Sequence, residues 1–174
     1  MGIEFSNNRE IELFVDDQKN IVIFPKSKSD GSGKEMVKDG YYVAYYPIEL
    51  KYPYTANELA EKIKCGFDEW DKHECYGNFS GKNTFEEKYY NIKGFKNAIK
   101  GKKRIDIWQN DKYMGNILYF NLPLKRGYGY EAIKPVKFPI DVEYIDYANT
   151  VIDLINLDME TIRYFRSIKS KLNI

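Results

Sequence analysis

The chain has 174 residues, of which 43% are hydrophobic and 30% charged, the balance of one globular domain with its own core. A formal net charge of +1 and only two cysteines exclude an extreme polyelectrolyte and a disulfide-stabilised scaffold. The sequence shows neither a signal peptide nor an apolar run near the ~20 residues of a membrane helix. We therefore expect a single domain over residues 1–174, located in the reducing cytoplasm and without a membrane partner.

The N-terminal quarter predicts strands. Residues 10–14 and 21–24 are short β-rich runs joined around Asp16-Asp17-Gln18, and residues 41–46 form a third run that ends at Pro47. The polar residues 26–40, rich in Ser, Gly and Lys, predict a loop.

Helix signals follow. Thr55 and Glu58 form a capping box ahead of an apolar stripe at helical spacing, made of Leu59, Ile63, Phe67 and Trp70. Thr84 and Glu87 repeat the same box. Residues 94–101 predict a short amphipathic helical segment that glycine stops.

The next segment returns to strands. Residues 104–108 and 116–122 alternate with a period of two around Asn110-Asp111, which predicts a β-hairpin with its turn at that dipeptide. Residues 127–133 and 136–138 are expected to continue the sheet, with Pro135 and Pro139 marking its edges.

Two helices are expected at the end of the chain. Asp141 is a candidate cap for an apolar stripe made of Ile145, Ala148, Val151, Ile152 and Ile155. Asp158 is a candidate cap for a last helix whose basic residues lie toward its C-terminus. The fold class is therefore α+β, with an antiparallel, largely meandering sheet and helices packed on it.

Catalytic or metal-binding patterns are weak in this sequence. Cys65, His73 and Cys75 are too few for a structural zinc site. The carboxylate pairs at residues 16–17 and 86–87 are adjacent, so regular structure points their side chains apart. We expect no enzymatic activity, no catalytic residue, no metal, no cofactor and no small-molecule substrate.

Charge is unevenly distributed. The net charge is −3 over residues 1–50, −2 over 51–90, +8 over 91–137 and −2 over 138–174. The basic block interleaves cations with aromatic residues, among them Lys102, Lys103 and Arg104. Two interpretations are open: a single-stranded nucleic-acid binding module that stacks bases on these strands, or a protein-binding surface in which a partner extends the sheet.

Four segments resemble those of the immunity proteins of bacterial contact-dependent growth inhibition systems: YPYTANELA at 52–60, GFKNAIKG at 94–101, LPLKRGY at 122–128 and DYANTVIDLIN at 146–156. The similarity extends from about residue 41 to residue 172. It implies a cytoplasmic immunity protein that binds one cognate C-terminal toxin domain, commonly a nuclease, in a one-to-one heterodimer and blocks it. In one branch of the family the toxin inserts a β-hairpin that extends the sheet.

The resemblance brings no catalytic motif, and it makes nucleic acid an unlikely partner. An inhibitor of a nuclease is expected to be acidic, and the basic block departs from that expectation. If a partner strand adds to the sheet, the candidate partner-binding residues are those that flank the expected hairpin: Trp108, Tyr113, Tyr119, Lys125, Arg126, Tyr128 and Tyr130.

Overall fold

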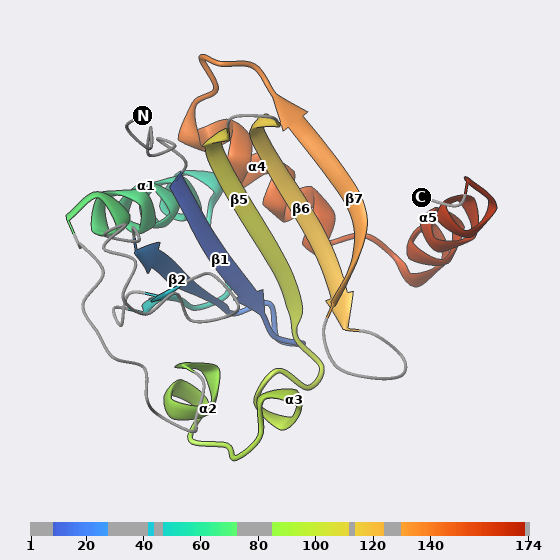
Figure 1. Cartoon of the computed structure of the whole chain (residues 1–174), viewed down its shortest axis with the longest axis horizontal. Helices are drawn as coiled ribbons and strands as arrows, with labels where there is room; N and C mark the ends of the chain where they lie inside the picture. The colour runs from blue at the N-terminus through green and yellow to red at the C-terminus, as the bar shows by residue number, and fades with distance from the viewer. Residues whose placement is uncertain are drawn as a thin grey trace, which may run out of the picture.

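The computed structural model describes residues 9–27, 42–43, 47–72, 85–111, 114–123 and 130–172. They form a seven-stranded antiparallel sheet with five helices, which confirms the α+β class (Figure 1). The strands are β1 (Arg9–Val15), β2 (Ile21–Ser27), β3 (Tyr42–Val43), β4 (Ile48–Leu50), β5 (Lys103–Asp111), β6 (Gly115–Pro123) and β7 (Tyr130–Phe138). The helices are α1 (Ala56–Lys72), α2 (Phe85–Tyr90), α3 (Phe95–Ala98), α4 (Tyr144–Ile155) and α5 (Met159–Leu172).

Two meanders meet at the centre of the sheet. The strand order is β3-β2-β1-β5-β6-β7, with β4 also paired to β2. β1 and β5 join the two halves, and their register sets Glu12 opposite Asp106. This long-range pairing places the N-terminal strand beside the first strand of the second meander.

One face of the sheet carries the main core. Strand residues such as Ile11, Leu13 and Ile105 are fully buried there against the apolar stripes of α1 and α4. In Figure 1 the strands pass in front of these two helices. α5 completes the cluster through Ile162 and contacts β7.

α1 lies close to the sheet because it carries a glycine at the contact. A Cβ placed on Gly66 would lie 3.1 Å from Cγ2 of Ile23 and 3.4 Å from Cγ2 of Ile11. The missing side chain allows the helix to approach β1 and β2 without displacing their isoleucines.

The opposite face is covered differently. Phe14, Val22 and Phe24 form a second, smaller cluster with Ile99, against which Tyr89 of α2 and Phe95 of α3 pack. Phe24 makes edge-to-face contacts with Phe14 and Tyr89, with ring centroids 5.7 and 5.5 Å apart. Among the described helices, only α2 and α3 contribute to this cluster, and they lie toward one end of the sheet (Figure 1).

Several local predictions are confirmed. The side chains of Thr55 and Glu58 form the capping box of α1, in which the backbone N–H of Glu58 donates to the hydroxyl of Thr55 at 3.2 Å and Glu58 Oε2 accepts from the backbone N–H of Thr55 at 2.7 Å. Asp158 Oδ1 caps α5 by accepting a 2.7 Å hydrogen bond from the backbone N–H of Thr161. The short helix after Gly94 forms and ends before Gly101, whose φ is +76°.

Other boundaries were predicted wrongly. The cap of α4 is Glu143, in a reciprocal box with Asp146, and not Asp141. In this box the backbone N–H of Glu143 donates to Asp146 Oδ2 at 3.0 Å, so the Asp146 side chain satisfies an amide at the helix start. β2 also continues through Ser27, into the predicted loop, because Lys26 and Ser27 pair with β3.

The hairpin of β5 and β6 is present, but its turn was placed too early. Asn110 and Asp111 belong to β5, where Asn110 has a φ of 57° and the register shifts before Asp111 pairs with Gly115. Asn tolerates this left-handed conformation within a bulge. Residues 130–138 form one strand through Pro135, which lies at the edge of the sheet opposite Tyr119.

Some of the predictions fall outside the described residues: those on Thr84, His73, Cys75 and most of the 26–40 loop.

Candidate functional site

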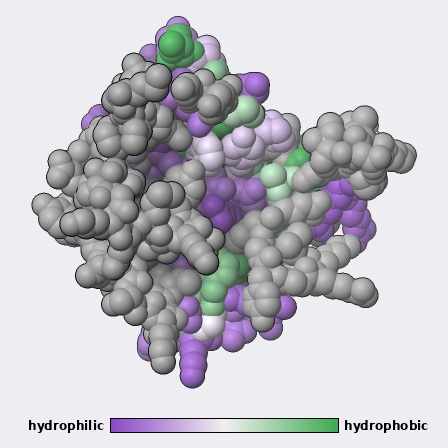
Figure 2. Space-filling view, viewed as in Figure 1, coloured by the Kyte–Doolittle hydropathy of each residue, from purple (hydrophilic) through white to green (hydrophobic). Residues whose placement is uncertain are grey.

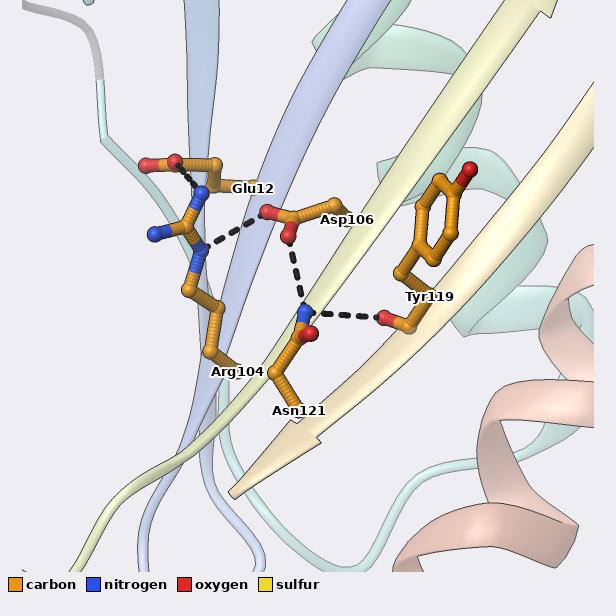
Figure 3. Close-up of polar contacts among 5 residues, drawn as sticks. All are labelled: Glu12, Arg104, Asp106, Tyr119 and Asn121. Atoms are coloured by element: carbon orange, nitrogen blue, oxygen red, sulfur yellow. Dashed lines mark hydrogen bonds and ion pairs between the residues drawn. The ribbon is translucent and has the colours of Figure 1, made fainter. Parts of the chain in front are cut away.

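A charged network lies on the sheet face opposite α1 and α4. Because side chains alternate along a strand, Glu10 and Glu12 of β1 share this face with Arg104 and Asp106 of β5. Arg104 Nη2 lies 2.5 Å from Glu12 Oε1, and its Nε lies 2.8 Å from Asp106 Oδ1 (Figure 3). One guanidinium therefore joins carboxylates of both strands.

Asn121 of β6 extends the network to a third strand. Its Nδ2 donates to Asp106 Oδ2 at 2.8 Å and to the backbone carbonyl of Tyr119 at 3.3 Å (Figure 3). Both oxygens of Asp106 thus accept hydrogen bonds. Burial by itself lowers the pKa of Arg104, but the nearby carboxylates of Glu12 and Asp106 outweigh it and raise this pKa above its usual value.

Glu10 adds a third carboxylate. One oxygen from each of Glu10, Glu12 and Asp106 lies within 4.8 Å of the others, and the three residues are only 4%, 5% and 8% exposed. Arg104 brings one positive charge to these three negative ones. Carboxylate oxygens are suitable ligands for hard divalent cations, but the guanidinium already takes the central position between Glu12 and Asp106.

An aromatic pair borders the carboxylates. Trp108 lies directly opposite Glu10, and Tyr119 directly opposite Asp106. The two rings meet edge to face with centroids 5.8 Å apart, and both side chains are half-buried. Burial, and then the carboxylates of Asp111 and Asp106, raise the pKa of Tyr119, so its hydroxyl stays protonated.

The indole N–H of Trp108 is the next feature of this face. Its Nε1 is buried, and no hydrogen-bond acceptor for it is found in the described part of the chain. A buried N–H donor without an acceptor is unfavourable.

Figure 2, in the same view as Figure 1, shows hydrophilic residues gathered at the centre of this face. We call the set Glu10, Glu12, Arg104, Asp106, Trp108 and Tyr119 the acidic–aromatic face.

The structure brings together two of the predicted partner-binding residues, Trp108 and Tyr119. Tyr130 begins β7, paired with Pro123 of β6. The other four predicted residues lie outside the described residues: Tyr113, Lys125, Arg126 and Tyr128.

The described cations at the start of β5 do not form one basic surface. Lys102 Nζ donates to the carbonyl of Ala98 at 2.8 Å, and Lys103 Nζ donates to the carbonyl of Ile155 at 2.9 Å. Arg104 points to the acidic–aromatic face. Three consecutive cations, Lys102, Lys103 and Arg104, thus have three different internal partners, so they do not form the continuous cation surface expected for nucleic-acid binding.

The carboxylates and Asn121 were missed by the sequence interpretation. Their signal was present: a charged residue at every second position in EIEL of β1 and RIDI of β5, between buried aliphatics. Two such strands signal a polar sheet face only if they pair, and residues 12 and 106 are far apart in the chain.

Comparisons with known proteins assign no family to this geometry. No protein-family model matches the chain, and no curated protein matches it significantly. Among the described residues, no helix has the length and apolar character needed to cross a membrane.

Proposed function

We propose that this protein is a cytoplasmic immunity protein that binds one cognate toxin domain in a one-to-one complex and neutralises it. The observation that carries the proposal is the acidic–aromatic face, where two half-buried aromatic rings lie beside three buried carboxylates on the sheet face opposite α1 and α4. Tyrosine and tryptophan are enriched in protein interfaces, and a negative surface attracts a domain whose own ligand is anionic. A nuclease toxin has such a basic surface.

The geometry supports this function over nucleic-acid binding. The cations Lys102, Lys103 and Arg104 are held by internal partners, so they are less available to bind phosphate. The acidic residues beside Trp108 and Tyr119 therefore support a protein partner, although the linear sequence carries a basic block.

Strand addition is a second route to the same complex. β7 is an outer strand of the sheet, paired with β6 among the described strands. Pro135 has no N–H for an added strand, and α5 contacts β7, so only part of this edge suits a toxin hairpin. Face binding is therefore the route that we favour.

The test is capture followed by protection. The tagged full chain is used to capture partners from cells that carry its gene, at high salt, and the captured protein is identified by mass spectrometry. The captured domain is then expressed with and without this chain. We expect a stoichiometric toxin domain, and growth only when the two are co-expressed.

The double variant Trp108→Ala, Tyr119→Ala is expected to lose protection. Tyr164→Ala is the matched control, because Tyr164 is 62% exposed on α5, and it should protect fully. A captured toxin that the double variant still neutralises would move the interface to the β7 edge. Recovery of nucleic acid alone, released as salt rises, would refute the immunity function.

A further inference from the structure

The connection between β7 and α4, residues 139–143, exposes an apolar side chain that the fold does not bury. Ile140 is 92% exposed, the largest fraction among the large hydrophobic residues of the described chain. Its connection lies at the top of Figure 1, and Figure 2 shows hydrophobic atoms at that tip. Single exposed apolar residues are ordinary on protein surfaces, and what distinguishes Ile140 is how firmly its turn is held.

The turn that carries Ile140 is fixed from inside the protein. Asn116 is 7% exposed, and its Nδ2 donates to the backbone carbonyl of Pro139 at 2.9 Å and lies 3.5 Å from that of Ile140. Its Oδ1 accepts from the backbone N–H of Asn110 at 3.0 Å, so one buried amide ties this turn to the bulge of β5. The backbone N–H of Val142 also donates to the Pro139 carbonyl, at 3.3 Å. Because the turn is already ordered, binding through Ile140 costs little further conformational entropy.

The same contacts place this tip beside the proposed interface. Two residues of β5 lead from Trp108 to Asn110, and Asn110 is bonded to the asparagine that holds the turn. Met114, which immediately precedes β6, is 37% exposed at the same end of the sheet, because Asn116 pairs with Phe138. The tip and the acidic–aromatic face therefore border each other.

The residues around Ile140 are acidic. Residues 138–146 contain Asp141, Glu143 and Asp146, all of them exposed, and no lysine or arginine. A protein that receives an apolar side chain among carboxylates must supply an apolar pocket bordered by basic residues. We propose that Ile140 is an anchor of the toxin interface, inserted into such a pocket of the bound domain. This inference rests on the proposed function and names one contact of that complex.

Two other occupants fit the tip less well. An anionic membrane surface repels carboxylates that lie beside an inserting side chain. A second copy of this chain would bring the same carboxylates, and one isoleucine from each copy is far less than the ~800 Å² per partner of a stable interface. A basic protein partner meets neither difficulty.

The test compares Ile140→Ser with the parent chain. Urea denaturation should give the same free energy of unfolding for both, because so exposed a side chain contributes little to the core. Calorimetric titration with the toxin domain identified by capture should show an affinity about tenfold or more lower for Ile140→Ser. Ile140→Val keeps an apolar, branched side chain and should retain most of the affinity.

The matched control is Ile92→Ser. Ile92 is 40% exposed and lies between α2 and α3, toward the opposite end of the sheet (Figure 1), so the same substitution there should leave toxin affinity unchanged. Asp141→Asn tests the charge beside the anchor. It should slow association with the toxin and reduce the dependence of association on salt.

Four results overturn the inference. A captured toxin that binds Ile140→Ser as tightly as the parent chain removes Ile140 from the interface and leaves the immunity function intact. Binding of the parent chain, but not of Ile140→Ser, to phosphatidylglycerol vesicles makes the tip a membrane contact. Dimers of the parent chain that Ile140→Ser abolishes, seen by sedimentation velocity, make it a contact between copies. Capture that yields no toxin domain removes the proposed function and the anchor with it.

Discussion

The two faces of the sheet differ in what their side chains contribute. On the face covered by α1 and α4, Ile11 and Leu13 of β1 are fully buried in the main core. On the other face, the alternate positions of the same strand hold Glu10 and Glu12, which belong to the charged network. Because a strand alternates its side chains, one seven-residue segment contributes to both the main core and the charged network.

This comparison makes a general prediction about variants. Substitutions on the helix-covered face should change the free energy of unfolding and leave the affinity of the folded protein unchanged. Substitutions on the acidic–aromatic face should change affinity, and should change stability only where they leave a buried charge unpaired.

The largest effect is expected for Phe67→Ala. Phe67 is fully buried in the main core, its ring lies 6.1 Å from that of Tyr144, and the guanidinium of Arg9 lies 4.8 Å above it. Removal of the ring should lower the free energy of unfolding by about 3–5 kcal/mol, measured by urea denaturation. A loss below about 1 kcal/mol would show that α1 contributes little to the core.

A somewhat smaller effect is expected for Arg104→Met. Glu12 and Asp106 are buried, so removal of the guanidinium that they share should cost about 2–4 kcal/mol at pH 7, less than for a fully buried pair because Arg104 is 25% exposed. The triple variant Arg104→Met, Glu12→Gln, Asp106→Asn should regain most of that loss, because the two carboxylates that contacted the guanidinium are replaced by neutral amides. Urea denaturation of both proteins measures the difference. A triple variant no more stable than Arg104→Met would show that the network contributes through packing and not through charge.

The helix-covered face could be predicted from the sequence, and the acidic–aromatic face only in part. The stripe Leu59, Ile63 and Phe67 has a local period, so α1 and its buried side were readable from neighbouring residues. The sequence also predicted the hairpin of β5 and β6, and this hairpin brings Trp108 and Tyr119 into contact.

The charged network depends on a contact that no local pattern contains. Glu12 meets Arg104 and Asp106 only because β1 pairs with β5, across the whole first half of the chain. The same pairing changes the meaning of the basic block. Arg104 counts as a free cation in the sequence, whereas in the fold it is the centre of an acidic cluster.

The smallest effect is expected for Tyr54→Phe, which tests whether polar atoms on the helix-covered face also contribute to stability. The Tyr54 hydroxyl donates a 2.9 Å hydrogen bond to the carbonyl of Lys19, and its ring packs against the main core. Loss of this bond should cost about 1 kcal/mol at neutral pH. Burial, and then the neighbouring Tyr52 and Asp16, raise the pKa of Tyr54 to about 12, above the usual value of 10.0.

The sign of the pH dependence follows from this shift. Between pH 10 and 12 the unfolded chain loses the Tyr54 proton before the folded chain does, so the stability that the neutral hydroxyl provides is complete below pH 10 and is lost as the pH rises through about 12. Tyr54→Phe should therefore lose less stability over this range than the parent protein, as measured by urea denaturation at each pH. Tyr164→Phe, at a 62% exposed position, is the control and should follow the parent curve. If Tyr54→Phe also follows the parent curve, then Tyr54 contributes to the covered face through its ring alone, and the hydroxyl bond to Lys19 adds nothing to stability.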